Sequence, residues 1–581
     1  MLKSPSKLYE ICLEVAVEDS ISACKFCKKE FRSLPNNVLF DFYYKMFLGK
    51  RLCLLAVELS ELEVFNRVVS VKHQRTKFLK SFQSLIDHGT NIPQQLVKTF
   101  IQCSQQSNFS EMNLIEVGLK MGAFFNEGGL FTHARDVLSV TEDICKKRDR
   151  DITTLRMLLD CYYKRIYSET IYCDFEKAST TFEAAQKVTK ELEEKDALPN
   201  LAGLYSNFSF LYFIRSEYNE AFSWTIKALK LLNDKLPKRI IIDVLRQASK
   251  ACVVKRKFAS AGLLISQAVN MASELYKLDG HPHFSDTLLD YGFYLLNFDS
   301  IPESVRVYEK ALTIRKEVFQ KNNIKVALGH EDLAYALYVN EYSSGRFYEA
   351  REHVERSIRI MERILPSDHL LLASVKRVKA LILEEIALDE RSNISLQNQY
   401  FTEAHSLHKS ALTLSFKAFG EKNVQTAKHY GNLGRLFQSM KFYDQAEKMH
   451  LKAIAIKEEL LGDNDHEVGL SVGHLASLYN YHMKRYKEAE QLYLRSIEIN
   501  LNLFGEAYSG LEYDYRGLVN IYTKIFDSYK MIHYIYKVRD WKTLRDSIQP
   551  VEHDPEVIPL KEIIEKLFST SGSFSLFKKT I

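Results

Sequence analysis

Small residues recur along this chain about every 42 residues, and this period constrains the fold more than any other feature. Successive members are between 40 residues (Ala221 to Ala261) and 54 residues (Ala350 to Ala404) apart, and each begins a stretch with helical periodicity. A small residue lets one helix approach another closely, so a regular series of them predicts stacked copies of one helical unit. The series is Ala134, Ala178, Ala221, Ala261, Ser304, Ala350, Ala404, Ala446 and Ala489.

Residues 431–453 show this unit most clearly. Gly434 lies in a first predicted helix, Met440 and Lys441 form a polar turn, and Ala446 and Ala453 lie in a second predicted helix. Such a hairpin cannot bury its apolar face alone, so it must stack on its neighbours. The pattern is that of tetratricopeptide repeats, lengthened from 34 residues to the long form that resembles kinesin light chain. We therefore predict an all-α superhelical solenoid of about nine to ten hairpins, preceded by a short helical segment.

The pattern divides the chain into four parts. Residues 1–50 carry two short helical motifs, and residues 51–110 are expected to form a helical connector. Residues 111–545 are the predicted solenoid, and residues 546–581 a C-terminal helix at 560–568 with a flexible tail. The single 54-residue step indicates a loop insertion at 389–393.

Composition argues against several classes of function. The 79 basic and 74 acidic residues leave a net charge of only +5, so no attraction to nucleic acid is expected. No uninterrupted apolar run reaches the 18 or so residues of a membrane span. The nine cysteines are typical of a reduced protein of the cytoplasm and nucleus. Cys24 and Cys27 lack a second ligand pair at zinc spacing, which favours inert thiols over a metal or redox site.

The first motif lies in a predicted amphipathic helix over residues 7–18. Leu8, Cys12 and Ala16 fall on one stripe, with Ile11 beside them. This Leu-x-x-x-Cys-x-x-x-Ala spacing resembles the BC-box, by which ubiquitin-ligase receptors insert a leucine and a cysteine into Elongin C. An ordinary core helix with a buried cysteine is the alternative.

The second motif follows the first closely. Leu34, Pro35, Val38 and Phe42 place a proline near a helix start and apolar residues on one helical face. This arrangement resembles the cullin-2 box. In isolation it could equally be a core helix begun by a proline, but the two motifs in succession favour docking surfaces.

Together with the long repeats, the two boxes resemble a family of tetratricopeptide-repeat substrate receptors of cullin-2 ubiquitin ligases. The segments 285–297, 423–436 and 510–518 carry the resemblance within the repeats. It implies as partners Elongin B/C, cullin-2 with its RING subunit, and C-terminal degrons of the Arg-x-x-Gly type. The same family is linked to trafficking of the amyloid precursor protein along microtubules. A cargo adaptor like kinesin light chain, with microtubule or peripheral membrane association, is therefore the alternative, and homo-oligomerisation stays open.

The sequence holds no motif for catalysis or for a cofactor: no phosphate-binding loop, dinucleotide fingerprint or zinc-protease motif. We expect a non-catalytic chain whose first helices line a concave groove. Counting from the small residues places alternating charges there, as an Arg-containing tail with a free carboxylate would need. The groove positions so counted include Asp286, Tyr335, Glu384, Ser477, Asn480 and Asp514. The residues expected to bind the degron are Asp290, Glu331, Asp332, Arg377, Lys428, Asn432 and Arg435.

Overall fold

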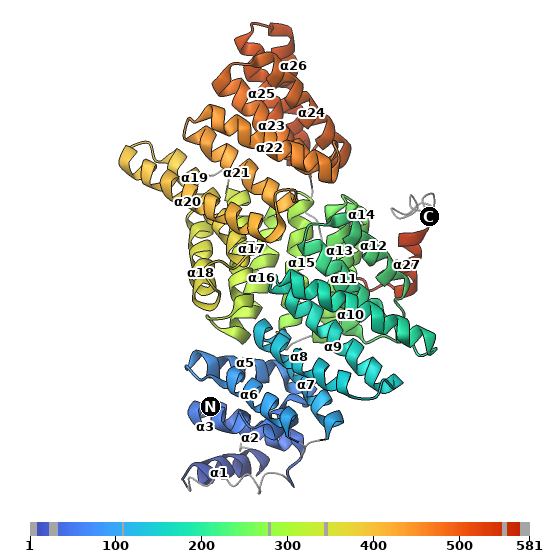
Figure 1. The fold of residues 1–581 in the computed structure, drawn as a ribbon. Coiled ribbons are helices and arrows are strands. Elements are labelled where there is room, and N and C mark those ends of the chain that lie inside the picture. Colours follow the sequence, from blue (N-terminus) through green and yellow to red (C-terminus); the bar gives the residue numbers. More distant parts are fainter. Residues whose placement is uncertain are drawn as a thin grey trace.

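The computed structural model describes residues 8–22, 33–106, 110–276, 280–341, 345, 347–548 and 555–569. Within these ranges all regular secondary structure is helical (Figure 1). None of the helices in the described ranges is both long enough and apolar enough to cross a bilayer. The first six helices are α1 (Leu8–Ser22), α2 (Asn36–Leu48), α3 (Leu52–Leu59), α4 (Leu62–Val69), α5 (Arg75–Asp87) and α6 (Ile92–Gln105).

The next twenty helices form ten antiparallel hairpins over the described residues, so the predicted solenoid is confirmed. The first five hairpins are α7–α8 (Glu111–Glu127, Phe131–Lys147), α9–α10 (Ile152–Ile171, Phe175–Glu194), α11–α12 (Ala202–Ile214, Tyr218–Lys230), α13–α14 (Lys238–Val254, Phe258–Tyr276) and α15–α16 (Pro282–Asn297, Ile301–Phe319). The last five are α17–α18 (Ile324–Glu341, Tyr348–Ile364), α19–α20 (Leu371–Asp389, Ile394–Phe419), α21–α22 (Val424–Ser439, Tyr443–Leu461), α23–α24 (His466–Ser477, Tyr486–Phe504) and α25–α26 (Leu511–Lys524, Ser528–Asp546).

The periodic small residues lie where the two helices of a hairpin meet. All nine members of the series, from Ala134 to Ala489, are completely buried. The facing helix often supplies a small residue too. A side chain added at Gly292 would meet the Tyr308 ring at 2.6 Å, and one at Gly434 would meet the His450 ring at 2.9 Å. The period therefore sets how closely the paired helices approach.

Helices α4 and α5 contact the first hairpin through a cluster of aromatic rings. Phe65, Phe78 and Phe82 surround Phe124 of α7, with ring centroids 4.6–5.5 Å from it. Offset and edge-on aromatic contacts of this kind join the segments firmly. The expected connector at 51–110 is therefore packed against the start of the solenoid.

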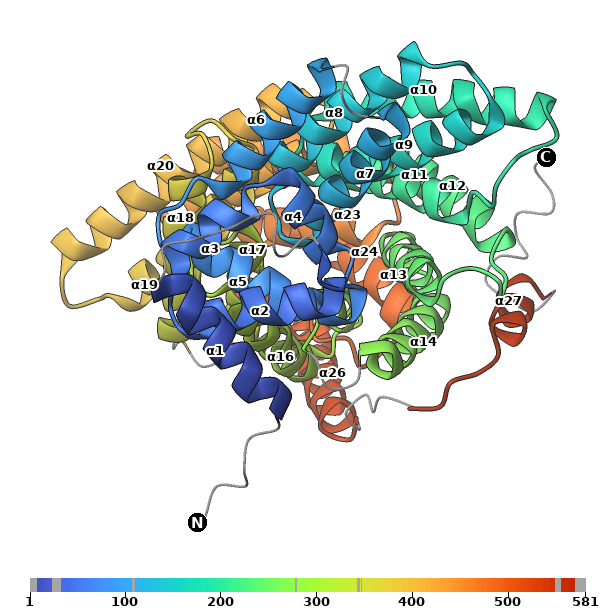
Figure 2. The same ribbon diagram turned by 90° about the horizontal axis from the view of Figure 1, so that it is seen from below.

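First helices of neighbouring hairpins pack on one another, α9 on α11, α11 on α13 and α13 on α15, so they form the inner layer of the superhelix. The second helices, such as α10, α12 and α14, lie on its outside (Figures 1 and 2). Figure 2 shows the hairpins arranged around the axis of the superhelix. This arrangement puts charged positions of the first helices on the inner wall.

Successive turns of the superhelix touch along a line that we call the seam. We call each contact across the seam a rung. A rung joins the loop between the two helices of one hairpin to the loop that leads into the fifth hairpin after it. Asn323 donates its side-chain N–H to the Gly128 carbonyl oxygen (2.8 Å), and Asn423 donates likewise to Arg215 (2.8 Å). Their separations of 195 and 208 residues correspond to five hairpins.

Three further rungs complete the seam. The Tyr172 and His369 rings meet edge-on at 4.4 Å. Arg256 pairs with Asp465 (3.4 Å), 209 residues later. Asp299 accepts hydrogen bonds from the Ser509 backbone N–H (2.8 Å) and hydroxyl (2.6 Å), 210 residues later. The inner groove is therefore closed along this side, an arrangement that the repeat period alone did not predict.

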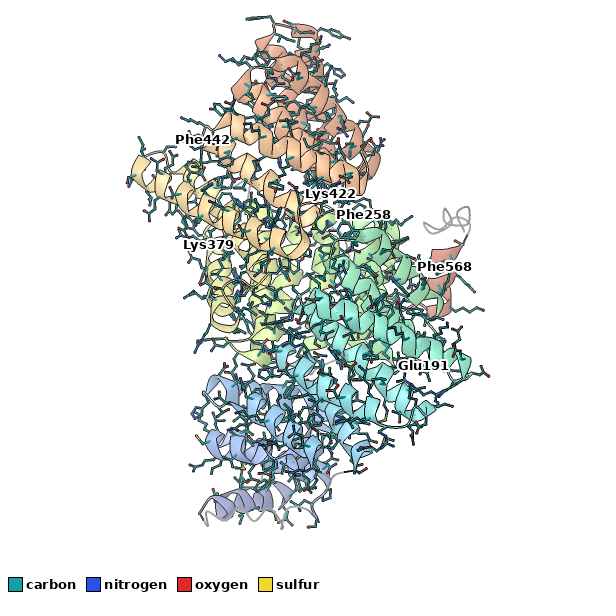
Figure 3. All side chains as sticks on the ribbon, in the orientation of Figure 1. Glu191, Phe258, Lys379, Lys422, Phe442 and Phe568 are labelled. Atoms are coloured by element: carbon teal, nitrogen blue, oxygen red, sulfur yellow. The ribbon has the colours of Figure 1, made fainter. Side chains whose placement is uncertain are left out.

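The last helix, α27, occupies Leu560–Phe568, the residues expected from the sequence. It packs against α14 on the outside of the superhelix, far from its neighbours in sequence (Figures 1 and 3). Leu560, Ile563 and Leu567 are buried there.

Candidate docking surface and peptide-binding groove

Helix α1 has two different apolar faces. Val17 is buried and Leu13 half-buried, and both belong to the core that continues into α2. The helix is also held by the Tyr9 hydroxyl, which donates to Asp41 (2.7 Å), and by an ion pair of Glu14 with Lys45.

The other face of α1 carries the four residues of the first motif. Leu8 is 76% exposed and Ile11 45% exposed, while Cys12 and Ala16 are exposed as well. Neighbouring Val15 is 58% exposed. An apolar stripe in solvent, opposite the packed stripe of the same helix, is a feature of interaction surfaces. The core-helix alternative does not fit Leu8 and Cys12 in this structure.

The second motif is divided between surface and core. Helix α2 begins at Asn36 with Pro35 as its N-terminal cap residue, and Pro35 is exposed. Leu34 and Val38 are half-buried. Phe42 is only 2% exposed and packs edge-on against Tyr43, so it does not share a free face with them. The structure thus corrects the expected face: Phe42 supports the helix from inside. Cys24 and Cys27 lie outside the described residues.

Two neighbouring carboxylates, Glu331 and Asp332, lie on the first helix α17. Burial and the adjacent Asp332 raise the pKa of Glu331 to about 7. Burial, with Asp290 adding to it, raises the pKa of Asp332 to about 6. Nearby guanidinium groups offset only part of this effect, Arg377 at Glu331 and Arg315 at Asp332. A ligand cation placed here would stabilise both charges.

Other charges that the sequence placed in the groove already have partners. Asp290 accepts from Arg246 (2.8 Å) and pairs with Lys250 (3.1 Å). It is therefore a poorer receptor for a ligand arginine than Glu331 or Asp332. Arg246 and Lys250 were not singled out from the sequence, although they lie at the same spacing from the small residue Ser249 as the counted groove positions do from theirs.

Two of the three expected cations are paired as well. Lys428 contacts Glu467 (2.9 Å), and Arg435 contacts Glu385 (2.9 Å) and Glu384 (3.6 Å). Arg377, in contrast, lies over the Tyr335 ring at 4.9 Å and is half-buried. Asn432 is half-buried on α21. A ligand carboxylate would therefore compete with protein carboxylates at Lys428 and Arg435.

Several counted groove positions are packing positions instead. Asp514 is 2% exposed and accepts from the Ser496 hydroxyl (2.7 Å), while burial raises its pKa to about 7. Asn480 is 2% exposed and donates to the Gly517 carbonyl oxygen (3.0 Å). Ser477 is buried too. Of these three residues, Asn480 lies in a π-helical turn at Leu478–Met483, where the helical spacing on which the counting depends does not hold.

Asp286 and Glu384 are also held by the protein itself. Asp286 pairs with Arg315 (2.7 Å) and Lys325 (3.1 Å), and these cations hold the pKa of that carboxyl well below its usual range. Glu384 is 1% exposed and accepts from the Ser439 hydroxyl (2.8 Å). Both carboxylates strengthen contacts between neighbouring hairpins rather than offer a binding site.

Two cavities border the seam. One of about 200 Å³ is lined by Lys428, Glu467, Gln425 and residues of the earlier turn such as Phe213 and Phe293. A larger one of about 580 Å³ lies between Arg256, Phe258, Asp299, Phe504 and Arg545. Among the described residues, no cluster of three or more histidine, cysteine or acidic side chains has the geometry for a metal ion.

The hairpins, their inner wall and their seam define a tetratricopeptide-repeat protein, a scaffold for binding other proteins. The family model described as "Tetratricopeptide repeat" matches residues 425–502. These residues include the hairpin α21–α22, which has the clearest pattern in the sequence.

More specifically, the chain belongs to the amyloid protein-binding protein 2 family. It is 47% identical over 546 residues to amyloid protein-binding protein 2 of Mus musculus, covering 93% of this chain and 92% of that protein. The protein of the same name from Rattus norvegicus matches with the same identity and coverage. This similarity confirms the membership of the repeat family that the sequence suggested, without bearing on a role in a ligase.

Solved structures align with this chain at low TM-scores. The apo form of the quorum sensor NprR from B. thuringiensis aligns with a TM-score of 0.43 at 13% identity, covering 66% of this chain and 97% of that one. A putative kinesin light chain from Podosopora anserina aligns with a TM-score of 0.27 at 18% identity, covering 38% and 97%.

Proposed function

We propose that this chain is the substrate-recognition subunit of a ubiquitin ligase built on cullin-2 and Elongin B/C. Its N-terminal helices dock onto Elongin C and cullin-2, and its inner groove binds C-terminal tails of the Arg-x-x-Gly type. The chemistry of ubiquitin transfer belongs to the assembled ligase, which would act in the cytoplasm and nucleus.

The observation that carries this proposal is the exposed stripe of α1. A helix that is part of a core hides its larger apolar residues, yet Leu8 and Ile11 are open while Val17 of the same helix is buried. The exposed residues are those that the BC-box motif buries in Elongin C. Pro35 on the nearby α2 is exposed as well, as docking of cullin-2 there requires.

The test is co-purification of Elongin C with the full chain. Leu8→Ala combined with Cys12→Phe should abolish binding, because the leucine contact is lost and a bulky ring does not fit a cysteine pocket. A matched control is Leu48→Ala with Cys53→Phe, which changes the same residue types at exposed positions of α2 and α3. Wild-type yield of Elongin C with the α1 variant would rule the docking face out.

The groove hypothesis rests on Glu331 and Asp332. A buried arginine–carboxylate contact is charge-assisted, and losing one partner costs roughly 2–5 kcal/mol, or tens- to thousands-fold in affinity. Reversing both residues to lysine should therefore abolish binding of a labelled tail peptide with Arg three residues before Gly. Fluorescence polarisation measures the affinity.

The control for this reversal is the exposed acidic pair Glu193 and Glu194, also changed to lysine. It alters the net charge equally but lies at the outer end of α10. Unchanged affinity in a folded Glu331→Lys, Asp332→Lys variant would place the arginine pocket elsewhere. Equal loss in both variants would indicate long-range attraction instead of a local site.

A transport adaptor is the second candidate, favoured by the name of the relatives. Under this hypothesis the groove binds the cytosolic tail of a membrane protein such as the amyloid precursor protein, and the chain associates with microtubules or membranes peripherally. Such an adaptor has no need of the α1 stripe, so the Elongin C experiment separates the two functions.

A further inference from the structure

Residues 555–569 are bound on the outer face of the solenoid as a peptide would be. The segment is extended up to Pro559 and helical from Leu560. It lies on α14, the second helix of the fourth hairpin, 286–291 residues earlier in the chain. This surface faces away from the inner wall that carries Glu331 and Asp332.

Two amide side chains of α14 hold the backbone of this segment. Gln267 and Asn270 each donate to the carbonyl oxygen of Glu556 at 2.9 Å. The Gln267 side-chain oxygen accepts from the Ile558 backbone N–H at 3.0 Å. Both amides are nearly fully buried, at 5% and 6% exposure. Contacts of this kind recognise an extended main chain whatever its side chains.

Apolar side chains supply the selectivity. Ile558 is half-buried, and Leu560, Ile563 and Leu567 are at most 5% exposed. Pro559 precedes the first residue of the helix and donates no N–H there. The outer face of α14 therefore fits an apolar residue and a proline, followed by two turns of helix. The helix has apolar residues at its first, fourth and eighth positions.

Residues 547–554 link the end of α26 at Asp546 to this segment. A short tether keeps a weakly bound peptide at high local concentration, so a site can stay filled although the peptide alone binds modestly. Release of the segment also leaves the nearby rung of the seam intact, because Arg545 contacts Asp299 ahead of the tether.

We propose that the outer face of α14 is a second peptide-binding site, filled in cis by residues 555–569 and open to a segment of another polypeptide with the same pattern. The site is independent of the ligase role and of the inner groove. Its ligands are extended, apolar, proline-containing segments that continue as a short amphipathic helix.

The experiment uses the full chain with a protease site inserted between Ile548 and Pro555. After cleavage, a labelled synthetic peptide of residues 555–569 should exchange with the released segment and bind saturably. The uncut chain should bind it at least tenfold more weakly, because its own segment competes. A peptide with Ile563→Asp should not bind, and this arm needs no change in the protein.

Two protein variants locate the site. Gln267→Ala with Asn270→Ala should weaken binding to the cleaved chain at least tenfold. Glu274→Ala, an exposed position one turn further along α14, should leave it unchanged. If the cleaved segment stays bound and no labelled peptide exchanges, the segment is a permanent part of the fold and the proposal fails. Binding that survives the double amide change would overturn it as well.

Discussion

At Gly434 the two helices of the eighth hairpin approach so closely that a single methyl group decides their fit. A Cβ at this position would lie 2.9 Å from the Cε1, Nδ1 and Nε2 atoms of the His450 ring, which is completely buried. Gly434→Ala should therefore destabilise the protein by about 1–3 kcal/mol through overpacking. Gly431 on the same helix is the matched control, since its added Cβ would meet only Ala453 at 3.8 Å.

Gly431→Ala is expected to be neutral or stabilising by up to about 1 kcal/mol, because alanine favours the helix. Thermal unfolding followed by circular dichroism compares the two variants. If both shift the midpoint equally, helix propensity and not the close approach to His450 controls this hairpin.

Glu331 gives a prediction about pH. Its pKa rises from 4.5 in the unfolded chain to about 7 in the folded one, so between these values the folded state binds more protons. The free energy of unfolding therefore falls as pH rises through this window. Glu331→Gln should remove this cost and be about 1–3 kcal/mol more stable than wild type at pH 8, with no gain at pH 4.

Urea unfolding at both pH values measures the difference from wild type. Glu194→Gln, at an exposed position, serves as the control for loss of one negative charge. A gain of equal size at pH 4 and pH 8 would contradict the role given to the Glu331 carboxylate. A gain at pH 8 alone would show that the ionised Glu331 carboxylate lowers the stability of the protein, as residues of binding sites often do.

At the scale of single elements, much of the structure follows from local pattern. The nine buried small residues and the bounds of α27 could be predicted because helical periodicity and close helix contacts leave a direct trace in sequence. It is harder to predict from sequence which face of a helix points outward. Phe42 and Asp514 were assigned to surfaces by spacing, yet both are buried, because adjacent helices of the chain pack over them.

Helix α2 offers a prediction that separates its two faces. Pro35→Ala with Val38→Asp should weaken binding of cullin-2 at least tenfold and spare Elongin C, since a charge would enter an apolar contact. Phe42→Ala should instead destabilise the N-terminal helices by about 3–5 kcal/mol, because that ring is part of the core. Pull-downs of each partner, with circular dichroism for folding, distinguish the outcomes. Equal loss of both partners in the first variant would mean that α2 is not a separate docking surface.

The seam belongs to the whole molecule and could not be predicted from the repeats. Hairpin length and packing angle together bring the sixth hairpin over the first, and small changes in either would open the superhelix. The contacts that result use ordinary polar residues such as Asn323, Asn423 and Asp299. Nothing local distinguishes them from other turn residues. The same limit applies to Arg246 and Lys250, whose pairing with Asp290 depends on how neighbouring first helices stack.

Asp299 is the residue through which the seam can be tested. It accepts from Ser509 and pairs with Arg545 (2.5 Å), and its backbone φ is +67°. Asp299→Asn keeps a residue type that tolerates this conformation but removes the charge opposite Arg545. The second turn of the superhelix should then separate from the first more often, because the free energy of this local opening falls by about 1–3 kcal/mol. Hydrogen exchange read by mass spectrometry should be at least fivefold faster around residues 295–302 and 505–512, and unchanged in α7 to α10.

Asp196→Asn is the matched control, since Asp196 also has positive φ (+49°) but is exposed at the end of α10. Equal exchange in the two variants would mean that the turns are held by the apolar contacts of the seam, such as Phe258 with Phe504 at 5.3 Å, and not by this polar rung.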